Sequence, residues 1–191
     1  MKVFEVVPDF TFQSFHTSDP ESQEFCEVVY SRELGRCEPI LPGWRPLRLF
    51  EESAKLKNGN FARSWGGGFV IDDYARNALG TLLEGKCEFL PLLPHKGEVF
   101  HVMNLLRCVD CLDETRTTRL VLKETGQMLT QIEKYYFVPE RVPESILFRL
   151  PKRSAVFTAT GLSNPESEFK TVVEHKSLTG LKFKELWSDS D

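Results

Sequence analysis

The stretch that most constrains the fold is residues 98–122, EVFHVMNLLRCVDCLDETRTTRLVL, near the middle of the chain. Between Val99 and Val109 it is apolar at all but three positions, which are His101, Asn104 and Arg107. A short run of this kind, rich in β-branched and aromatic residues, predicts a strand buried on both faces, with a buried helix segment as the alternative. Residues 117–122, TTRLVL, predict a second strand. We expect this pair to lie near the middle of the main sheet.

Two further segments share one plan, in which a strand is followed by a capped helix, a glycine and another strand. The first is residues 69–90, where Asp72 would cap the helix, and the second is residues 155–186, where Asn164 would do so. Apolar residues at helical spacing predict one buried face for each helix. The pattern predicts an α+β fold with a mixed β-sheet core and two or three amphipathic helices. Two strand–helix–strand units would flank a central antiparallel pair.

Length and composition are those of one globular domain. The chain has 191 residues, of which 41% are apolar and 27% charged, so we expect one domain over residues 1–191. Lobes 1–95 and 96–191 are the alternative. A net charge of −4 argues against binding to nucleic-acid phosphates, which requires a basic face.

Apolar runs and cysteine usage in the sequence indicate the cellular compartment of the protein. It has no run of about 20 apolar residues to cross a bilayer and no apolar signal region at the N-terminus. Its five cysteines are an odd number without the spacing of a disulfide framework, which fits a reducing compartment. We therefore expect a cytoplasmic protein that does not bind a membrane.

An acidic segment follows the first predicted strands. Residues 19–38 hold six acidic residues against two arginines, and a Pro after Asp19 predicts the start of a helix. Glu21, Glu24 and Glu27 would lie on one face, opposite an apolar face. That face is either simply solvated or a docking surface for a basic partner, and these three residues are our candidate contacts.

Cys108 and Cys111 form the single CxxC pair of the chain. A small metal- or thiol-dependent enzyme could use them together with Asp110 or Asp113. However, the pair follows a strand instead of opening a helix, and no second Cys/His pair lies at a zinc spacing, so we favour buried or half-buried thiols. The acidic residues Asp110, Asp113 and Glu114 could also hold a cation, but we expect them to be turn caps and solvated loop residues. Because no nucleophile, base and orienting group can be assembled, we expect no enzyme, metal or cofactor.

Residues 65–68, WGGG, form a glycine-rich turn that precedes a predicted strand. Phosphate-binding loops have the opposite order, because they follow a strand and open a helix. We expect a flexible loop. The alternative is a lid over a small-molecule site, which would make the chain a ligand-binding regulatory domain.

Residues 98–118, EVFHVMNLLRCVDCLDETRTT, resemble one family of immunity proteins from bacterial polymorphic toxin systems. This family is the eleventh in the immunity series and was formerly catalogued as a domain of unknown function. The run MNLLRCVDCLD at 103–113 is similar to the family's pattern VNVLxVVDxLD. The resemblance keeps order and spacing over about residues 44–187, and its other matching pieces are residues 69–72, 88–92, 146–150, 178–183 and 185–186. One departure is the inserted segment 158–164 before the last helix, where members usually have a capping Ser.

The resemblance implies a protein that binds a cognate toxin in its own cell and neutralises it by occluding a protein surface. All of the matching positions are scaffold positions, so no toxin-contact residue is carried over from the family. The expected partner is the toxin protein. The oligomeric state is left open.

Overall fold

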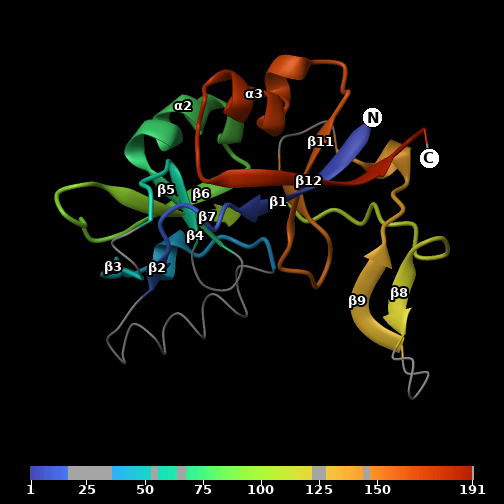
Figure 1. Ribbon diagram of the computed structural model, residues 1–191, viewed down its shortest axis with the longest axis horizontal. Coiled ribbons are helices and arrows are strands. Elements are labelled where there is room, and N and C mark those ends of the chain that lie inside the picture. Colours follow the sequence, from blue (N-terminus) through green and yellow to red (C-terminus); the bar gives the residue numbers. More distant parts are fainter. Residues whose placement is uncertain (17–35, 53–55, 64–67, 122–127, 144–146, 191) are drawn as a thin grey trace.

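The computed structural model describes residues 1–16, 36–52, 56–63, 68–121, 128–143 and 147–190 (Figure 1). Its strands are β1 (Lys2–Pro8), β2 (Phe15–His16), β3 (Phe50–Glu51), β4 (Phe61–Arg63), β5 (Phe69–Asp72), β6 (Cys87–Pro91), β7 (Phe100–Leu105), β8 (Thr118–Val121), β9 (Met128–Lys134), β10 (Phe148–Arg149), β11 (Val156–Thr160) and β12 (Leu181–Ser188). Its helices are α2 (Asp73–Leu83), α3 (Phe169–His175) and the short 3-10 helices η1 (Leu41–Gly43), η3 (Pro139–Arg141) and η4 (Pro165–Ser167).

The described strands form two four-stranded sheets, with the orders β4-β5-β7-β6 and β10-β11-β1-β12. A hairpin of β8 and β9 and a short pair of β2 and β3 complete the β structure. The predicted α+β class is confirmed. All hydrogen-bonded neighbours among these strands are antiparallel, however, so the expected mixed sheet is wrong in that respect.

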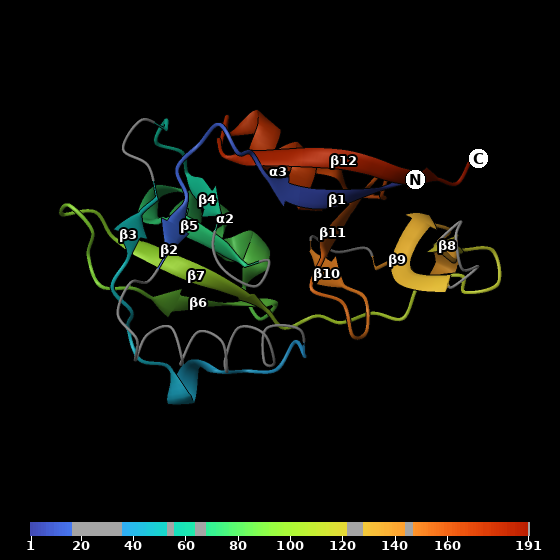
Figure 2. The same ribbon diagram turned by 60° about the horizontal axis from the view of Figure 1, so that its bottom comes forward.

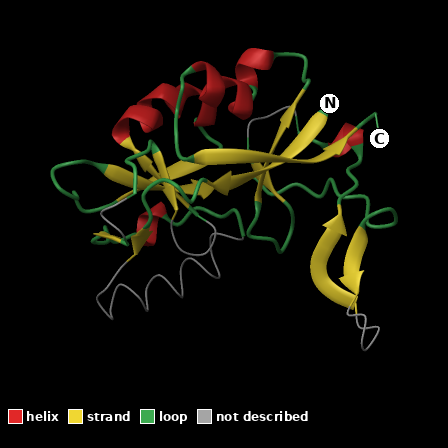
Figure 3. Ribbon diagram, viewed as in Figure 1, coloured by secondary structure: helices red, strands yellow, loops and turns green. Residues whose placement is uncertain are grey.

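Each four-stranded sheet contains one strand–helix–strand unit, as predicted. The units are β5–α2–β6 and β11–α3–β12, and α2, α3 and η4 lie together on one side of the strands (Figure 3). In each sheet the two strands of the unit are parallel to each other and are separated by one antiparallel strand. That strand is β7 in the first sheet and β1 in the second.

The predicted strand in the middle of the chain is β7, and all six of its residues are buried. Phe100 and Val102 belong to the apolar cluster on one face of the first sheet, whereas Met103 and Leu105 belong to the cluster under the helices. Successive side chains of a strand point to opposite faces, so β7 needs apolar cover on both sides.

The expected pairing of this strand with residues 117–122 is wrong. β8 does form there, but it pairs with β9 and not with β7. The hairpin of β8 and β9 lies at the opposite end of the molecule from β6 (Figure 2). The physical reason is that β8 carries Thr118 and Arg119 and has no fully buried residue, so it can lie at the surface.

Helix α2 begins where the sequence predicts. The Asp72 carboxylate accepts a hydrogen bond from the Ala75 amide at 2.7 Å, which satisfies one of the free amides at the helix start. Ala75, Leu79 and Leu83 of this helix are fully buried in the cluster shared with both sheets. The amphipathic face is therefore confirmed.

Asn164 caps a shorter element than expected. Its side chain accepts a hydrogen bond from the Glu166 amide at 3.1 Å, and this cap belongs to η4, whereas α3 begins only at Phe169. The Glu168 amide donates to the Pro165 carbonyl, which closes a tight turn instead of an α-helical one. A capping signature thus marks the start of a helix but not its type.

The two sheets meet at Gly180, just before β12. The Phe61 amide donates to the Thr179 carbonyl and the Asp9 amide donates to the Gly180 carbonyl, each at 2.9 Å. Gly180 has a φ of +100°, a conformation that glycine adopts without strain. Its backbone is so close to that of Phe61 that a side chain would not fit. This glycine therefore joins the sheets rather than ending α3, which stops at His175.

Candidate functional site

Our sequence-based candidate contacts lie outside the described residues. Glu21, Glu24 and Glu27 fall in the segment 17–35, for which the structure gives no placement. Residues 65–67 of the glycine-rich turn also lie outside the described residues.

The structure separates the two thiols of the CxxC pair. Cys108 is exposed, so the expectation of a buried or half-buried thiol is wrong for this residue. Cys111 is fully buried in the apolar cluster with Leu112 and Phe137, as expected. Burial raises the pKa of the Cys111 thiol to about 12, so it carries little thiolate at neutral pH. Within the described ranges, no three or more His, Cys, Asp or Glu side chains converge on a position for a metal ion.

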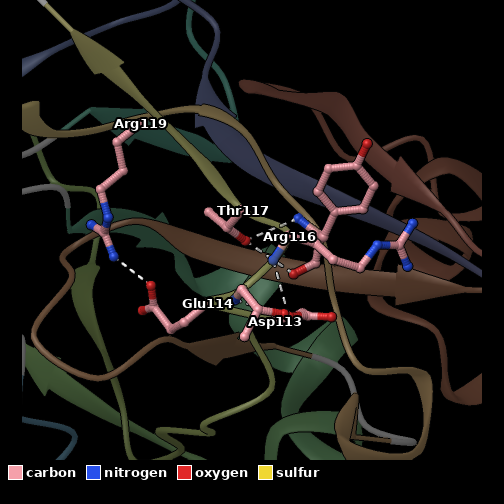
Figure 4. A network of polar contacts seen from close by, with 7 residues as sticks. Asp113, Glu114, Arg116, Thr117 and Arg119 are labelled. Atoms are coloured by element: carbon pink, nitrogen blue, oxygen red, sulfur yellow. Dashed lines mark hydrogen bonds and ion pairs between the residues drawn. The ribbon is translucent and has the colours of Figure 1, made fainter.

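The carboxylates of Asp113 and Glu114, which follow β7, make different polar contacts (Figure 4). Asp113 Oδ1 accepts hydrogen bonds from the Thr115 hydroxyl at 2.7 Å, the Thr115 amide at 3.0 Å and the Arg116 amide at 3.2 Å. These bonds, the hydroxyl one first, lower the pKa of Asp113. Glu114 forms an ion pair with Arg119. Asp113 thus caps the turn that leads into β8, and Glu114 is an exposed loop residue in an ion pair. Both roles are those expected for carboxylates at a strand end.

A polar cavity of about 360 Å³ opens beside the start of α2. It is formed by the loop at 58–60, the first turn of α2, residues 98–100 and Thr179. These segments meet because β5 pairs with β7, which sets Asp72 opposite Phe100. The wall carries three carboxylates and neither Lys nor Arg; the acidic residues are Asp72, Asp73 and Glu98. We call this cavity the α2 pocket.

The three carboxylates of the α2 pocket differ in their hydrogen-bond and ion-pair partners. Asp72 accepts from the Asn60 side-chain amide at 2.8 Å as well as capping α2. Asp73 pairs with Arg76 at 3.2 Å. Among the described residues, none forms an ion pair with Glu98. Its carboxylate is therefore the one best able to meet a cation from outside.

The rim of the α2 pocket is apolar and exposed. The Tyr74 side chain is 65% exposed and Val99 is 45% exposed, although both are large hydrophobic residues. Tyrosine is enriched among the residues that dominate binding energy in protein interfaces. An exposed aromatic residue next to a free carboxylate is suited to bind a basic side chain and its apolar surroundings.

A second cavity, of about 790 Å³, lies between α2 and α3. Its floor includes Ala78, Leu82 and Val172, which also pack against the core. Lys86 and Lys176 line it, but Lys86 already donates to the Leu82 carbonyl at 3.2 Å. No large hydrophobic residue on its wall is strongly exposed, so we rank it below the α2 pocket as an interaction surface.

The α2 pocket was not predicted from the sequence, although the sequence does indicate that Tyr74 is exposed. Since Asp72 caps α2 and residues 75, 79 and 83 face the core, Tyr74 must point outward. Nothing local indicates that Glu98 and Val99 lie beside Tyr74. That contact depends on the pairing of β5 with β7, which no pattern in the sequence specifies.

Comparison with models of protein families gives a match that covers most of the chain. Residues 52–187 match the model of the immunity protein family Imm11. This range includes β4 to β11, the helices α2 and α3, and most of β12. A search of curated proteins finds no match to this chain. None of the described helices is long and apolar enough to cross a membrane. Because the family model matches more than half of its residues, the chain belongs to the immunity protein family Imm11.

Proposed function

We propose that this protein binds a cognate toxin of a bacterial polymorphic toxin system and neutralises it by occluding the toxin's surface in the cytoplasm. The observation that carries the proposal is membership of the immunity protein family over residues 52–187. Neutralisation by occlusion requires tight binding only, so it needs neither a catalytic group nor a cofactor. A nanomolar dissociation constant corresponds to about 12 kcal/mol of binding free energy.

The proposal includes a single domain over residues 1–191. β1, from the start of the chain, lies between β11 and β12. β7, from the second half, lies between β5 and β6. Each sheet thus combines strands from both sides of residue 95, which supports one folding unit over two lobes.

We place the toxin contact at the α2 pocket and its rim. A standard interface buries about 1,600 Å² in total, with a few buried anchors near its centre. Tyr74 and Val99 supply exposed apolar area, and Glu98 supplies a carboxylate without an ion-pair partner among the described residues. The complementary surface on the toxin carries a Lys or Arg side chain that enters the pocket.

The direct test of the function is neutralisation. The toxin encoded next to this gene is expressed in a sensitive bacterial strain, with and without this protein. Growth should be restored only when both are present, and the purified proteins should form a stoichiometric complex. If the protein does not bind or neutralise that toxin, the proposed function is wrong.

Replacing Tyr74 by alanine tests the contact surface. We expect a dissociation constant about 30-fold weaker, because truncating a central aromatic anchor typically loses 2 kcal/mol or more. Isothermal titration calorimetry with the toxin measures it. The matched control is Val121→Ala on β8, since Val121 is also half-exposed but lies at the far end of the molecule. If the Tyr74→Ala variant bound the toxin as tightly as the Val121→Ala variant, the α2 pocket would be excluded as the contact surface.

Reversing the charges of Glu21, Glu24 and Glu27 to lysine tests our sequence-based candidates. If they face a basic toxin surface, binding should weaken and its salt dependence should decrease, because fewer opposite charges attract across the interface. Affinities measured over a series of salt concentrations provide the readout. An unchanged affinity and salt slope would mean that these glutamates form only a solvated face.

A further inference from the structure

The segment that contains Cys37 is tied to the first sheet by side-chain hydrogen bonds. The Asn104 side-chain amide of β7 donates to the Glu38 carbonyl at 2.9 Å. The Glu88 carboxylate of β6 accepts from the Ile40 amide at 2.9 Å and from the Asn104 amide at 2.9 Å. Residue 37 is therefore held near the far end of β7, although it lies far from β7 in the sequence.

Two backbone hydrogen bonds position Cys108, which follows β7, beside β10. The Arg149 amide donates to the Arg107 carbonyl at 2.9 Å, and the Val109 amide donates to the Arg149 carbonyl at 2.8 Å. These two bonds set Cys108 opposite Arg149 of β10. Besides burial, the neighbouring Cys108 side chain contributes to raising the pKa of the Cys37 thiol, which means that the two side chains are close to each other.

A buried arginine adjoins this thiol pair. Arg149 is only 1% exposed, and its Nη1 donates to the Ser154 carbonyl at 2.6 Å. Its Nε is buried without a hydrogen-bond partner, and no described carboxylate forms an ion pair with it. The side chains that act electrostatically on its charge are thiols, those of Cys37, Cys108 and Cys87. A buried cation that lacks a carboxylate partner is costly. The effect of burial, which raises the pKa of the Cys37 thiol, is larger than that of the Arg149 charge, which acts to lower this pKa.

The two thiols differ in access. Cys108 is exposed, whereas Cys37 is half-buried in a backbone conformation with a φ of +60° that non-glycine residues seldom adopt. Burial raises the pKa of the Cys37 thiol to about 12, and the charge of Arg149 acts in the opposite direction. An oxidant from solution therefore meets Cys108 first, and Cys37 is the neighbour that can react second.

We infer that Cys37 and Cys108 are an oxidisable pair, which a small-molecule disulfide such as oxidised glutathione converts into an intrachain disulfide. The Cys108 thiolate attacks one sulfur of glutathione disulfide and releases one glutathione thiolate, which takes up the proton that Cys108 lost. The Cys37 sulfur then attacks the Cys108 sulfur and releases the second glutathione, which takes up the proton from Cys37. Two cysteine thiols are oxidised, and one glutathione disulfide is reduced to two thiols.

The bond would tie the segment at 36–41 to the crossing of β7 and β10. It closes a loop between positions 37 and 108, and so restricts the unfolded chain. For a loop of this length we expect oxidation to raise the midpoint of thermal unfolding by about 10 °C.

The test uses the full chain incubated with oxidised glutathione, followed by alkylation of free thiols, intact mass and peptide mapping. We expect a loss of two hydrogen atoms, one linked peptide that joins Cys37 to Cys108, and the rise in unfolding midpoint. The Cys111→Ala control should behave in the same way. The Cys37→Ala variant should instead keep a glutathione adduct on Cys108, with no rise.

Three results would overturn the inference. They are a persistent glutathione adduct on Cys108 of the unchanged protein, a bond from Cys108 to Cys111 or Cys26, and full recovery of alkylated thiols. Each outcome is read without the toxin, so it is independent of the proposed function.

Discussion

Replacing Gly180 by alanine should lower the free energy of unfolding by about 3–5 kcal/mol. A Cβ atom at this position would overlap the Phe61 carbonyl oxygen and lie 2.9 Å from the Phe61 carbonyl carbon. The atoms in the way are backbone atoms, which cannot rotate aside as the end of a long side chain can. The φ of +100° adds strain for any residue with a Cβ atom.

The effect should be large because Gly180 lies where the two sheets join. If β4 moved away to make room, the hydrogen bond from the Phe61 amide to the Thr179 carbonyl would be lost. The bond from the Asp9 amide to the Gly180 carbonyl would be strained as well. Alanine thus causes either a clash or the loss of contacts between the sheets.

Gly80→Ala is the matched control, because the chemical change is identical. Gly80 lies inside α2 with open space where a Cβ atom would be, so alanine should stabilise the protein by about 1 kcal/mol. Chemical denaturation followed by far-ultraviolet circular dichroism measures both variants. Equal effects of the two substitutions would contradict the role of Gly180 at the junction.

Replacing Phe157 by alanine should lower the free energy of unfolding by about 3–5 kcal/mol, the range for truncating a buried aromatic side chain. Phe157 is fully buried in β11. Its ring lies 5.7 Å from that of Phe148, 5.9 Å from that of Tyr135 and 6.1 Å from that of Phe137. Removing it leaves a cavity between β10, β11 and the segment that joins β9 to η3, and this cavity cannot collapse without moving the sheet.

Phe10→Ala is the control for this second substitution. Phe10 is 67% exposed, and its ring contacts the guanidinium of Arg63 at 5.3 Å. Its loss should change the free energy of unfolding by no more than about 0.5 kcal/mol. The same denaturation experiment applies. If Phe157→Ala were as mild as Phe10→Ala, the aromatic cluster around β11 would not be a stabilising core.

The sequence by itself determined the local elements of this protein. The run around Val102 specified a buried strand, and the residues from Asp72 to Leu83 specified a capped helix with one apolar face. The repeated strand–helix–strand plan was visible for the same reason. These features depend on the period of side chains along a helix or strand, which neighbouring residues define.

Only the tertiary structure decided which elements meet. β8 pairs with β9 and does not join the sheet of β7, because the partner of a strand depends on contacts with residues far along the chain. The tertiary structure also brought Tyr74 beside Glu98, and Cys37 beside Cys108 and Arg149. Both proposed sites are thus products of long-range packing. The side chains that form each of them come from separate segments, and the spacing of residues in the sequence carries no record of that proximity.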